Sequence, residues 1–216
     1  MKKALTILVC SALFVAQAFA AWEKEMAAFK KQDEENPPQQ GLTLFVGSST
    51  FTIWKNMQED MPDIPLINRG FGGSQVNDLI EQYDTVIAPY HPRHIVIYEG
   101  DNDLATGKAP ELVLSHYKQL VTMIRSQYPE VPITIVSVKP SESRRNKMEE
   151  MLELNQMINV WASLTENLYY LNTFDITVNG EGNPITEYFL EDKLHLNQNG
   201  YKAWARKIVE HLTKVN

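Results

Sequence analysis

The feature that most constrains the fold is a regular alternation of short apolar runs with longer helical periods. Five runs have the length and the Val, Ile, Leu and Tyr content of buried strands: Leu42–Val46, Ile64–Asn68, His94–Tyr98, Ile133–Val138 and Leu168–Leu171. Between and after them, apolar residues recur at helical spacing over about 76–88, 110–127, 145–167 and 198–214. Alternating strands and helices predict a parallel sheet covered on both faces. We therefore expect an α/β protein with a three-layer α/β/α architecture around five doubly wound, parallel strands.

The first twenty residues have a different character from the rest of the chain. Lys2 and Lys3 precede an apolar run over about 4–15, and the small-x-small site Ala18-Phe19-Ala20 follows it. This pattern is typical of a cleaved bacterial signal peptide, because the run is too short for a transmembrane anchor. We therefore expect a signal peptide over residues 1–20, a single domain over 21–216, and export to the periplasm or the medium.

Composition limits the partners of the expected domain. The chain has 216 residues, of which 44% are hydrophobic and 22% charged, values typical of one globular domain. Its net charge of -7 argues against nucleic acid as a partner, and no stable membrane insertion is expected after signal cleavage. The only cysteine, Cys10, lies in the expected signal peptide, so the mature chain would contain no thiol or disulfide.

Two serines follow the first expected strand, at the edge where parallel sheets bind ligands. Ser48 and Ser49 come directly after Gly47, so they are either a helix cap or a nucleophile. A serine nucleophile needs a base, and four of the five histidines lie at the wrong edge or inside helices. The fifth, His195, lies in a loop ahead of the last helix, and Asp192 at three residues' distance can orient its imidazole.

Acyl transfer also needs hydrogen-bond donors for a developing oxyanion. A glycine-rich turn, Gly70-Phe71-Gly72-Gly73, follows the second expected strand and can expose backbone N–H groups. Asn102 follows the third and carries a side-chain amide. Each could be a simple turn residue, but all of these positions fall at one edge of the sheet.

Together these positions resemble the SGNH (GDSL-type) hydrolases, a family named for Ser, Gly, Asn and His in four short blocks. The blocks correspond to "FVGSSTFTIW", "NRGFGGS", "GDND" and "DKLHLNQNGY", which span most of the chain. The resemblance implies a flavodoxin-like fold, a triad of Ser49, Asp192 and His195, and an oxyanion hole of Ser49, Gly73 and Asn102. Whether Gly72 or Gly73 supplies the N–H stays open. Ser48 and Ser74 stand where the family commonly has Asp.

The function that this resemblance implies is that of a serine esterase without cofactor or metal. Loops after the first four expected strands are short, which favours short acyl esters from acetyl to butyryl, with O-acetyl groups on carbohydrate among the expected substrates. Phe174, Tyr188 and Phe189 lie in the longest loop, where they either meet a sugar or pack the loop down. The alternatives are an exported O-acyltransferase with the same triad, a lysophospholipase or lipase, a non-catalytic carbohydrate-binding domain, and a metal hydrolase built on Glu99, Asp101 and Asp103.

Overall fold

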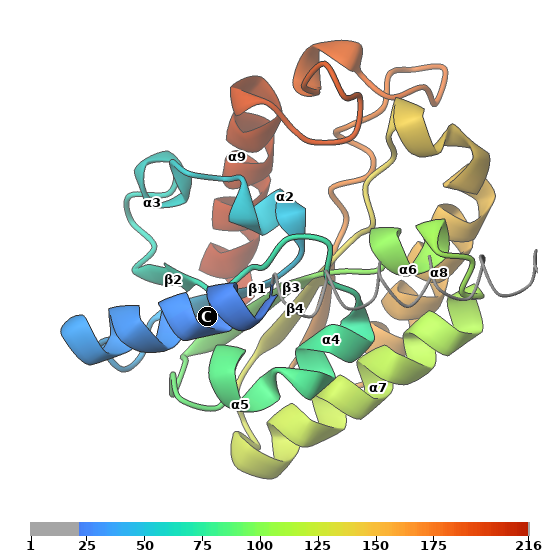
Figure 1. The fold of residues 1–216 in the computed structure, drawn as a ribbon. Helices are drawn as coiled ribbons and strands as arrows, with labels where there is room; N and C mark the ends of the chain where they lie inside the picture. Colours follow the sequence, from blue (N-terminus) through green and yellow to red (C-terminus); the bar gives the residue numbers. More distant parts are fainter. Residues whose placement is uncertain (1–21, 216) are drawn as a thin grey trace, which may run out of the picture. The chain divides into compact units, whose positions relative to one another are not determined.

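The computed structural model describes residues 22–215, so the expected signal peptide lies outside the described residues. Contacts divide the chain between Pro38 and Gln39 into two units. In the first unit, residues 22–35 form a helix. The second unit contains the sheet and all the candidate site residues (Figure 1).

The sheet has five parallel strands in the order β2-β1-β3-β4-β5. Their bounds are β1 Thr43–Gly47, β2 Leu66–Asn68, β3 His94–Tyr98, β4 Ile133–Val136 and β5 Leu168–Leu171. This is the 2-1-3-4-5 order of flavodoxin-like folds, in which the winding direction reverses between β1 and β3. The predicted five-stranded, doubly wound α/β/α fold is confirmed. Ligands of such sheets bind at the carboxyl ends of the strands beside this reversal.

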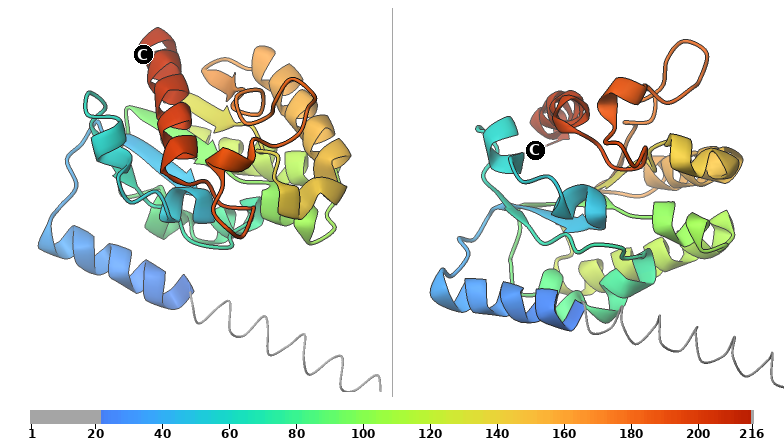
Figure 2. Two further views of the ribbon diagram at one scale, coloured as in Figure 1. Left: turned by 90° about the horizontal axis from the view of Figure 1, so that it is seen from above. Right: turned by 45° about the horizontal axis from the view of Figure 1, so that its top comes forward.

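Helices cover both faces of the sheet (Figures 1 and 2). The helix α3 contacts α9 on one face, whereas α4 contacts α7 and α7 contacts α8 on the other. The helical segments are α2 Ser49–Thr52, α3 Met57–Asp60, α4 Val76–Glu81, α5 Tyr83–Val86, α6 Asp101–Ala105, α7 Pro110–Gln127, η1 Glu142–Lys147, α8 Met148–Ser163, η2 Thr186–Tyr188 and α9 Gln198–Val215. None of the described helices is long and apolar enough to cross a membrane.

An aromatic cluster fixes α2 and α9 to the sheet. The ring of Phe51 in α2 meets that of Phe45 in β1 edge-on at 5.4 Å between centroids. Tyr98 of β3 meets Trp204 of α9 at 5.3 Å, and all four side chains are fully buried. Burial of one such ring stabilises the folded state by roughly 1.5–3 kcal/mol. The first turn of α2 is therefore held rigidly on the sheet.

Two strands are shorter than the sequence predicts. The run expected from Ile64 pairs only from Leu66, because the N–H of Ile64 closes a turn onto the carbonyl of Met61 at 3.2 Å. The run expected to reach Val138 ends at Val136, because both backbone groups of Val138 bond to the side-chain amide of Asn155 in α8. In both cases, a polar partner outside the sheet takes the backbone group away from the ladder.

Two predicted helices are divided. The helix expected over 76–88 breaks at Gln82, and beyond the break the Tyr83 hydroxyl donates to Gln127 Oε1 of α7 at 3.0 Å. The helix expected near 145–167 becomes a 3-10 segment, η1, followed by α8, and Arg144 inside η1 has non-helical angles of φ -121° and ψ 28°. The helices over 110–127 and from 198 begin and end close to the predicted residues.

Candidate active site

The end of β1 brings its backbone unusually close to β3. Gly47 has a φ of +149°, and a Cβ there would lie 2.1 Å from the carbonyl oxygen of Tyr98. The N–H of Ser48 donates to the same oxygen at 3.2 Å. Only glycine fits this approach, and it places Ser49, the first residue of α2, at the carboxyl edge of the sheet.

Ser48 supports the turn through its backbone and not through its hydroxyl. Its carbonyl accepts the N–H groups of Phe51 at 3.0 Å and Thr52 at 3.2 Å. Its own Oγ is buried, makes no capping bond and has no hydrogen-bond partner among the described residues. The helix-cap alternative for the serine pair therefore lacks the side-chain bond that defines a cap.

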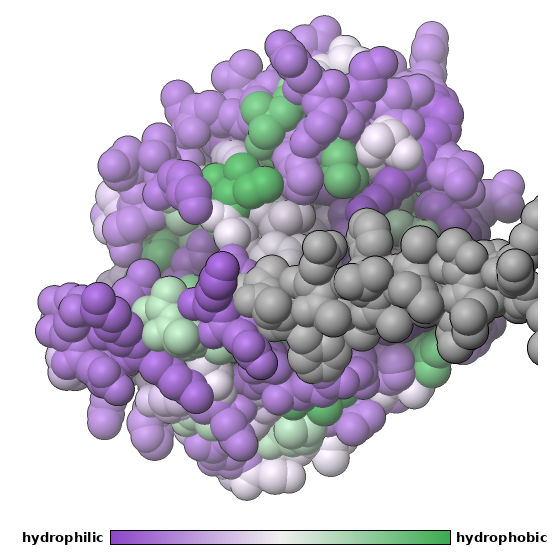
Figure 3. All heavy atoms as spheres, in the orientation of Figure 1, coloured by the Kyte–Doolittle hydropathy of each residue, from purple (hydrophilic) through white to green (hydrophobic). Residues whose placement is uncertain are grey.

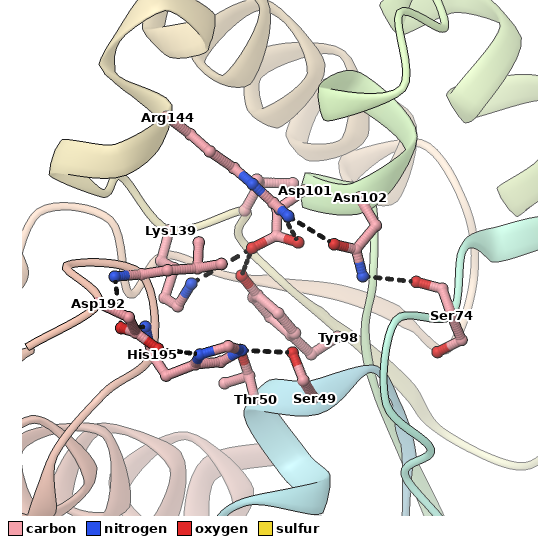
Figure 4. Close-up of polar contacts among 12 residues, drawn as sticks. Ser49, Thr50, Ser74, Tyr98, Asp101, Asn102, Lys139, Arg144, Asp192 and His195 are labelled. Carbon is pink, nitrogen blue, oxygen red and sulfur yellow. Dashed lines mark hydrogen bonds and ion pairs between the residues drawn. The ribbon is translucent and has the colours of Figure 1, made fainter. Parts of the chain in front are cut away.

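Three of the predicted site residues form a hydrogen-bonded row (Figure 4). The Oγ of Ser49 lies 2.9 Å from Nε2 of His195, and Nδ1 of the same ring lies 2.6 Å from Oδ2 of Asp192. Ser49 follows β1, whereas the other two come from the segment between η2 and α9. The fold thus joins residues that are 146 positions apart in the chain.

A tight turn holds the carboxylate and the imidazole in register. The Oδ1 atom of Asp192 accepts the backbone N–H groups of Leu194 at 2.9 Å and His195 at 3.0 Å. Lys193 between them has a φ of +55°, a left-handed conformation that is uncommon for a residue with a side chain. Leu190 closes the loop by donating its N–H to the His195 carbonyl at 2.8 Å. The Asp-x-x-His spacing therefore works as the sequence predicts, through local hydrogen bonds.

These hydrogen bonds determine the charge of Asp192. Partial burial acts to raise its pKa, but the bonds from the His195 ring and from the two N–H groups outweigh it and lower the pKa to about 2. The side chain is 46% exposed, and that of His195 is 21% exposed. Asp192 is therefore a carboxylate at neutral pH and can only accept from Nδ1.

Besides the N–H of Ser49 after β1, the predicted oxyanion donors lie after β2 and β3. Gly73 has a φ of +76°, whereas Gly72 is not in the left-handed region. Asn102 is the second residue of α6, and in the view of Figure 4 Ser49 lies between His195 on one side and Asn102 with Ser74 on the other. The Nδ2 atom of Asn102 donates to the Ser74 carbonyl at 2.9 Å.

A buried group of charged side chains contacts Asn102 through Arg144. The carboxylate of Asp101 is 3.2 Å from Lys139 Nζ, 2.6 Å from Arg144 Nη1 and 3.1 Å from the Tyr98 hydroxyl. Burial acts to raise the pKa of Asp101, but the charges of Lys139 and Arg144 outweigh it, and the pKa is lowered. Burial lowers the pKa of Lys139, although Asp101 opposes this. This salt-bridged cluster (Asp101, Lys139 and Arg144, with Tyr98) is the main part of the site that the sequence analysis missed.

A second buried carboxyl supports Ser74. The Ser74 hydroxyl has one proton, and it lies 2.9 Å from the Phe71 carbonyl and 2.5 Å from Glu99 Oε1. Both are acceptors, so the single hydroxyl proton can go to either of them. Burial and then the nearby Asp103 charge raise the pKa of Glu99 well above its ordinary value, although the bond from Ser74 opposes this.

The three carboxylates of the metal-hydrolase alternative have separate partners. Glu99 pairs with Ser74, Asp101 with Lys139 and Arg144, and Asp103 with Lys108 at 2.9 Å and the N–H of Val76. Within residues 22–215, no three His, Cys, Asp or Glu side chains gather in a group that could hold a metal ion. The Glu99–Asp103 stretch therefore does not form the shared site that this alternative requires.

The sequence gives different amounts of information about Lys139 and Arg144, the two cations that the sequence analysis did not assign to the site. Lys139 directly follows the fourth apolar run, at the ligand-binding edge, so its position was visible in the sequence. Arg144 lies in a charged stretch, "SESRRNK", in which nothing separates it from its exposed neighbour Arg145. Only the fold shows that one arginine turns towards the site and the other pairs with Glu142.

A flavodoxin-like sheet with Ser, Gly and Asn after its first three strands and His after its last is the arrangement of an SGNH-type hydrolase. The chain belongs to the GDSL-like lipase/acylhydrolase family, since the sequence model of this family matches residues 43–203. Among curated proteins, no match was found.

Solved structures with the same fold are similar to nearly the whole chain. One from Streptococcus pneumonia, named for platelet activating factor, has a TM-score of 0.84 and 21% identity over 95% of this chain and 99% of its own. A GDSL-like lipase from Bacteroides thetaiotaomicron has a TM-score of 0.75 and 19% identity over 88% and 100%. A family 3 carbohydrate esterase from Talaromyces cellulolyticus has a TM-score of 0.64 and 13% identity, and the match covers 82% of this chain and 98% of the esterase. At these identities the similarity shows the fold.

Proposed function

We propose that this protein is a serine acylhydrolase that cleaves short-chain acyl esters, including O-acetyl groups on carbohydrate. The observation that carries the proposal is the unbroken row of two hydrogen bonds from Ser49 through His195 to Asp192. In this row, Ser49 is the nucleophile, His195 is the base and Asp192 orients the base.

The direction of proton transfer follows from the charges. Asp192 is ionised at neutral pH, so Nδ1 of His195 carries the proton and Nε2 is free to accept the Ser49 proton. As the Ser49 oxygen attacks the acyl carbonyl, the imidazolium forms and the carboxylate stabilises it. His195 then protonates the leaving alcohol, and a water molecule repeats the sequence on the acyl-enzyme.

In this mechanism the oxyanion depends on individual donors. The N–H groups of Ser49 and Gly73 and the Asn102 amide would receive the negative charge. The helix α2 has only four residues, so its dipole contributes little. Loss of a single donor should therefore lower kcat.

The carbohydrate part of the proposal is supported by the relatives and not by aromatic residues. Two structural neighbours are family 3 carbohydrate esterases. In the loop between β5 and α9, Phe174 and Phe189 are buried and Tyr188 is partly buried, so these rings pack the loop down. On the face shown in Figure 3, hydrophilic residues predominate and the visible hydrophobic ones form small, separate areas.

Replacement of the two serines tests the nucleophile. Ser49→Ala should keep the fold and lower kcat/KM by roughly 10³-fold or more, as for removal of a triad member. Ser48→Ala is the matched control, because its buried Oγ has no described partner, and it should retain most activity. If the control is inactive and Ser49→Ala is active, the assignment of Ser49 is wrong.

A substrate series tests the reaction type and the acyl length. We expect kcat/KM on p-nitrophenyl esters to be highest between acetyl and butyryl, and acetylated sugars to be hydrolysed. An optimum at long chains with interfacial activation would instead make the protein a lipase or lysophospholipase. Acyl transfer to an added sugar in preference to water would make it an acyltransferase. No labelling of Ser49 by a fluorophosphonate would support the carbohydrate-binding alternative.

The proposed location is outside the cytoplasm, by way of a signal peptide at residues 1–20. Expression of the full chain in a bacterium, followed by amino-terminal sequencing of the protein from the periplasm and medium, tests this. A mature protein that starts at Ala21 supports export, whereas an intact protein that stays in the cytoplasm contradicts it.

A further inference from the structure

We propose that Arg144 is a positioning residue for Asn102: its guanidinium fixes the side-chain amide so that one N–H of Nδ2 stays available for the oxyanion. This inference rests on the proposed ester hydrolysis. It assigns a role in the reaction to a residue of η1 that lies outside the four sequence blocks.

The chemistry of the two neighbours allows only one orientation of the amide. Nη2 of Arg144 lies 2.7 Å from Oδ1 of Asn102, and the Ser74 carbonyl lies 2.9 Å from Nδ2. Guanidinium groups only donate and carbonyl oxygens only accept. A flipped amide would place donor against donor at Arg144 and acceptor against acceptor at Ser74. The two contacts together therefore exclude the flipped state, and the Arg144 contact is the one that holds Oδ1.

The same contacts leave one hydrogen unassigned. An Asn amide nitrogen carries two hydrogens, of which Asn102 gives one to Ser74. The other is the donor that the mechanism needs. Without Arg144, Oδ1 would lose its described partner, and rotation of the amide would direct this donor away from the developing charge. A preorganised donor avoids that reorganisation during the reaction.

Arg144 is itself held in place from two sides. Its Nη1 lies 2.6 Å from Asp101 Oδ1, and its side chain is 18% exposed. Its backbone leaves the helical conformation within η1, and its N–H donates to the Ser141 carbonyl at 3.2 Å. Asp101 is in turn held by Lys139. The guanidinium is thus a fixed bridge between the buried salt-bridged cluster and the Asn102 amide (Figure 4).

The segment η1 also contacts the histidine loop. The N–H of Ser143 donates to the carbonyl of Lys193, the residue after Asp192, at 3.2 Å. One short segment therefore contacts both the donor side and the base side of the site. This contact uses the backbone, so a change of the Arg144 side chain leaves it intact and affects only the Asn102 side.

A double-mutant cycle with Arg144→Met and Asn102→Ala tests the proposal. Arg144→Met keeps the aliphatic length but cannot donate, and we expect kcat to fall by roughly 10- to 100-fold with KM little changed, as for a misplaced group. Asn102→Ala should lower kcat by roughly 10²- to 10³-fold. In the Asn102→Ala background, Arg144→Met should change kcat by no more than ~2-fold, because its effect passes through Asn102. Arg145→Met is the matched control, since Arg145 is exposed and pairs with Glu142, and it should behave as the wild type.

Two further measurements separate positioning from a structural role. Arg144→Lys keeps the charge and is the replacement to use if Arg144→Met does not fold. It cannot bridge Asp101 and Asn102 as a fork, and we expect the same selective loss of kcat. Added guanidinium ion should restore part of the kcat of Arg144→Ala at concentrations that leave the wild type folded. A structural defect would not respond in this way.

The outcomes distinguish this inference from the proposed function. Equal losses from Arg144→Met in both backgrounds, or a raised KM with normal kcat, would overturn the positioning role and leave the esterase proposal standing. Normal kcat in Asn102→Ala would remove Asn102 from the oxyanion hole and the positioning role with it. Loss in Asn102→Ala together with full activity in both Arg144 variants would overturn only the role of Arg144.

Discussion

The site contains two aspartates in opposite surroundings. Asp192 lies on a loop with its side chain 46% exposed, and its partners lie within three residues of it in the chain. Asp101 is 6% exposed, and its partners Lys139 and Arg144 come from a different part of the chain. Both carboxyl groups have a lowered pKa, the first through local hydrogen bonds and the second through buried cations.

This difference indicates that the two aspartates have different roles, one in the proposed reaction and the other in the stability of the fold. Under the proposed function, Asp192 acts on a proton that moves in each cycle, and its solvent exposure means that the fold depends little on it. Asp101 touches none of the reacting groups, but it balances charges that would otherwise be buried alone. Replacement of the first should therefore damage catalysis, and replacement of the second should damage stability.

The largest effect is expected from Asp192→Asn. An amide in place of the carboxylate can donate to Nδ1 and so favour the wrong tautomer of His195, and kcat should fall by roughly 10⁴-fold. The midpoint of urea unfolding should stay close to that of the wild type. Steady-state kinetics and urea titration check both parts, with the exposed neighbour Glu191→Gln as control. A large loss of stability would mean that the loop is part of the folding unit after all.

The next effect is expected from Asp101→Asn. It leaves the cation of Lys139, which is 1% exposed, without an anionic partner, and such a change destabilises a protein by roughly 3–5 kcal/mol. The free energy of unfolding from urea titration is the measurement. The exposed Glu142→Gln removes a surface ion pair instead and should leave stability nearly unchanged. An Asp101→Asn protein as stable as the wild type would show that Lys139 is neutral in the fold.

A smaller and pH-dependent effect is expected from Glu99→Gln. Glutamine keeps an oxygen that can accept from the Ser74 hydroxyl, but it does not titrate. The pKa of Glu99 is raised well above 4.5, so above that pH the unfolded chain loses a proton that the folded protein keeps. The contribution of Glu99 to the stability of the wild type therefore falls as pH rises through this window, and the variant lacks this contribution.

Urea titration at about pH 4 and about pH 8, below and above the ordinary glutamate pKa, checks the effect of Glu99→Gln. The advantage of the variant over the wild type should be larger at the higher pH. An advantage that is the same at both pH values would mean that Glu99 does not titrate between them. Asp103, whose carboxylate pairs with Lys108, offers a contrast, because Asp103→Asn removes an ion pair and should not stabilise.

The sequence predicts what depends on periodicity and on local spacing. The five strands and their parallel arrangement follow from the apolar runs, and the turn that joins Asp192 to His195 follows from their three-residue separation. It does not predict contacts that depend on where a helix breaks. The kink at Arg144 lies within a stretch of polar residues without apolar period, so the sequence offers no reason to expect it.

The sequence also does not predict that the acidic residues after β3 are buried, and the reason is physical. Glu99, Asp101 and Asp103 look like a solvated loop or a set of metal ligands, since acidic residues are seldom buried without partners. Ser74, the partner of Glu99, and Lys139, a partner of Asp101, lie 25 and 38 residues away in other segments, whereas Lys108 is five residues from Asp103. Pairing of this kind depends on the three-dimensional fold, and one sequence without its relatives contains no record of it.

The close approach at Gly47 has a consequence for how this site can vary. Because a Cβ there would overlap the Tyr98 carbonyl, no side chain of any kind fits without separating β1 from β3. One position further on, the Ser48 hydroxyl has no described partner, so that position can change its side chain freely within the available volume. A library that randomises residues 47–49 should therefore return glycine alone at the first position and a mixture of small residues at the second. The location of Ser49, the proposed nucleophile, is set by the spacing of these two backbones, so selection on activity can alter position 48 but cannot move Ser49 along the edge of the sheet.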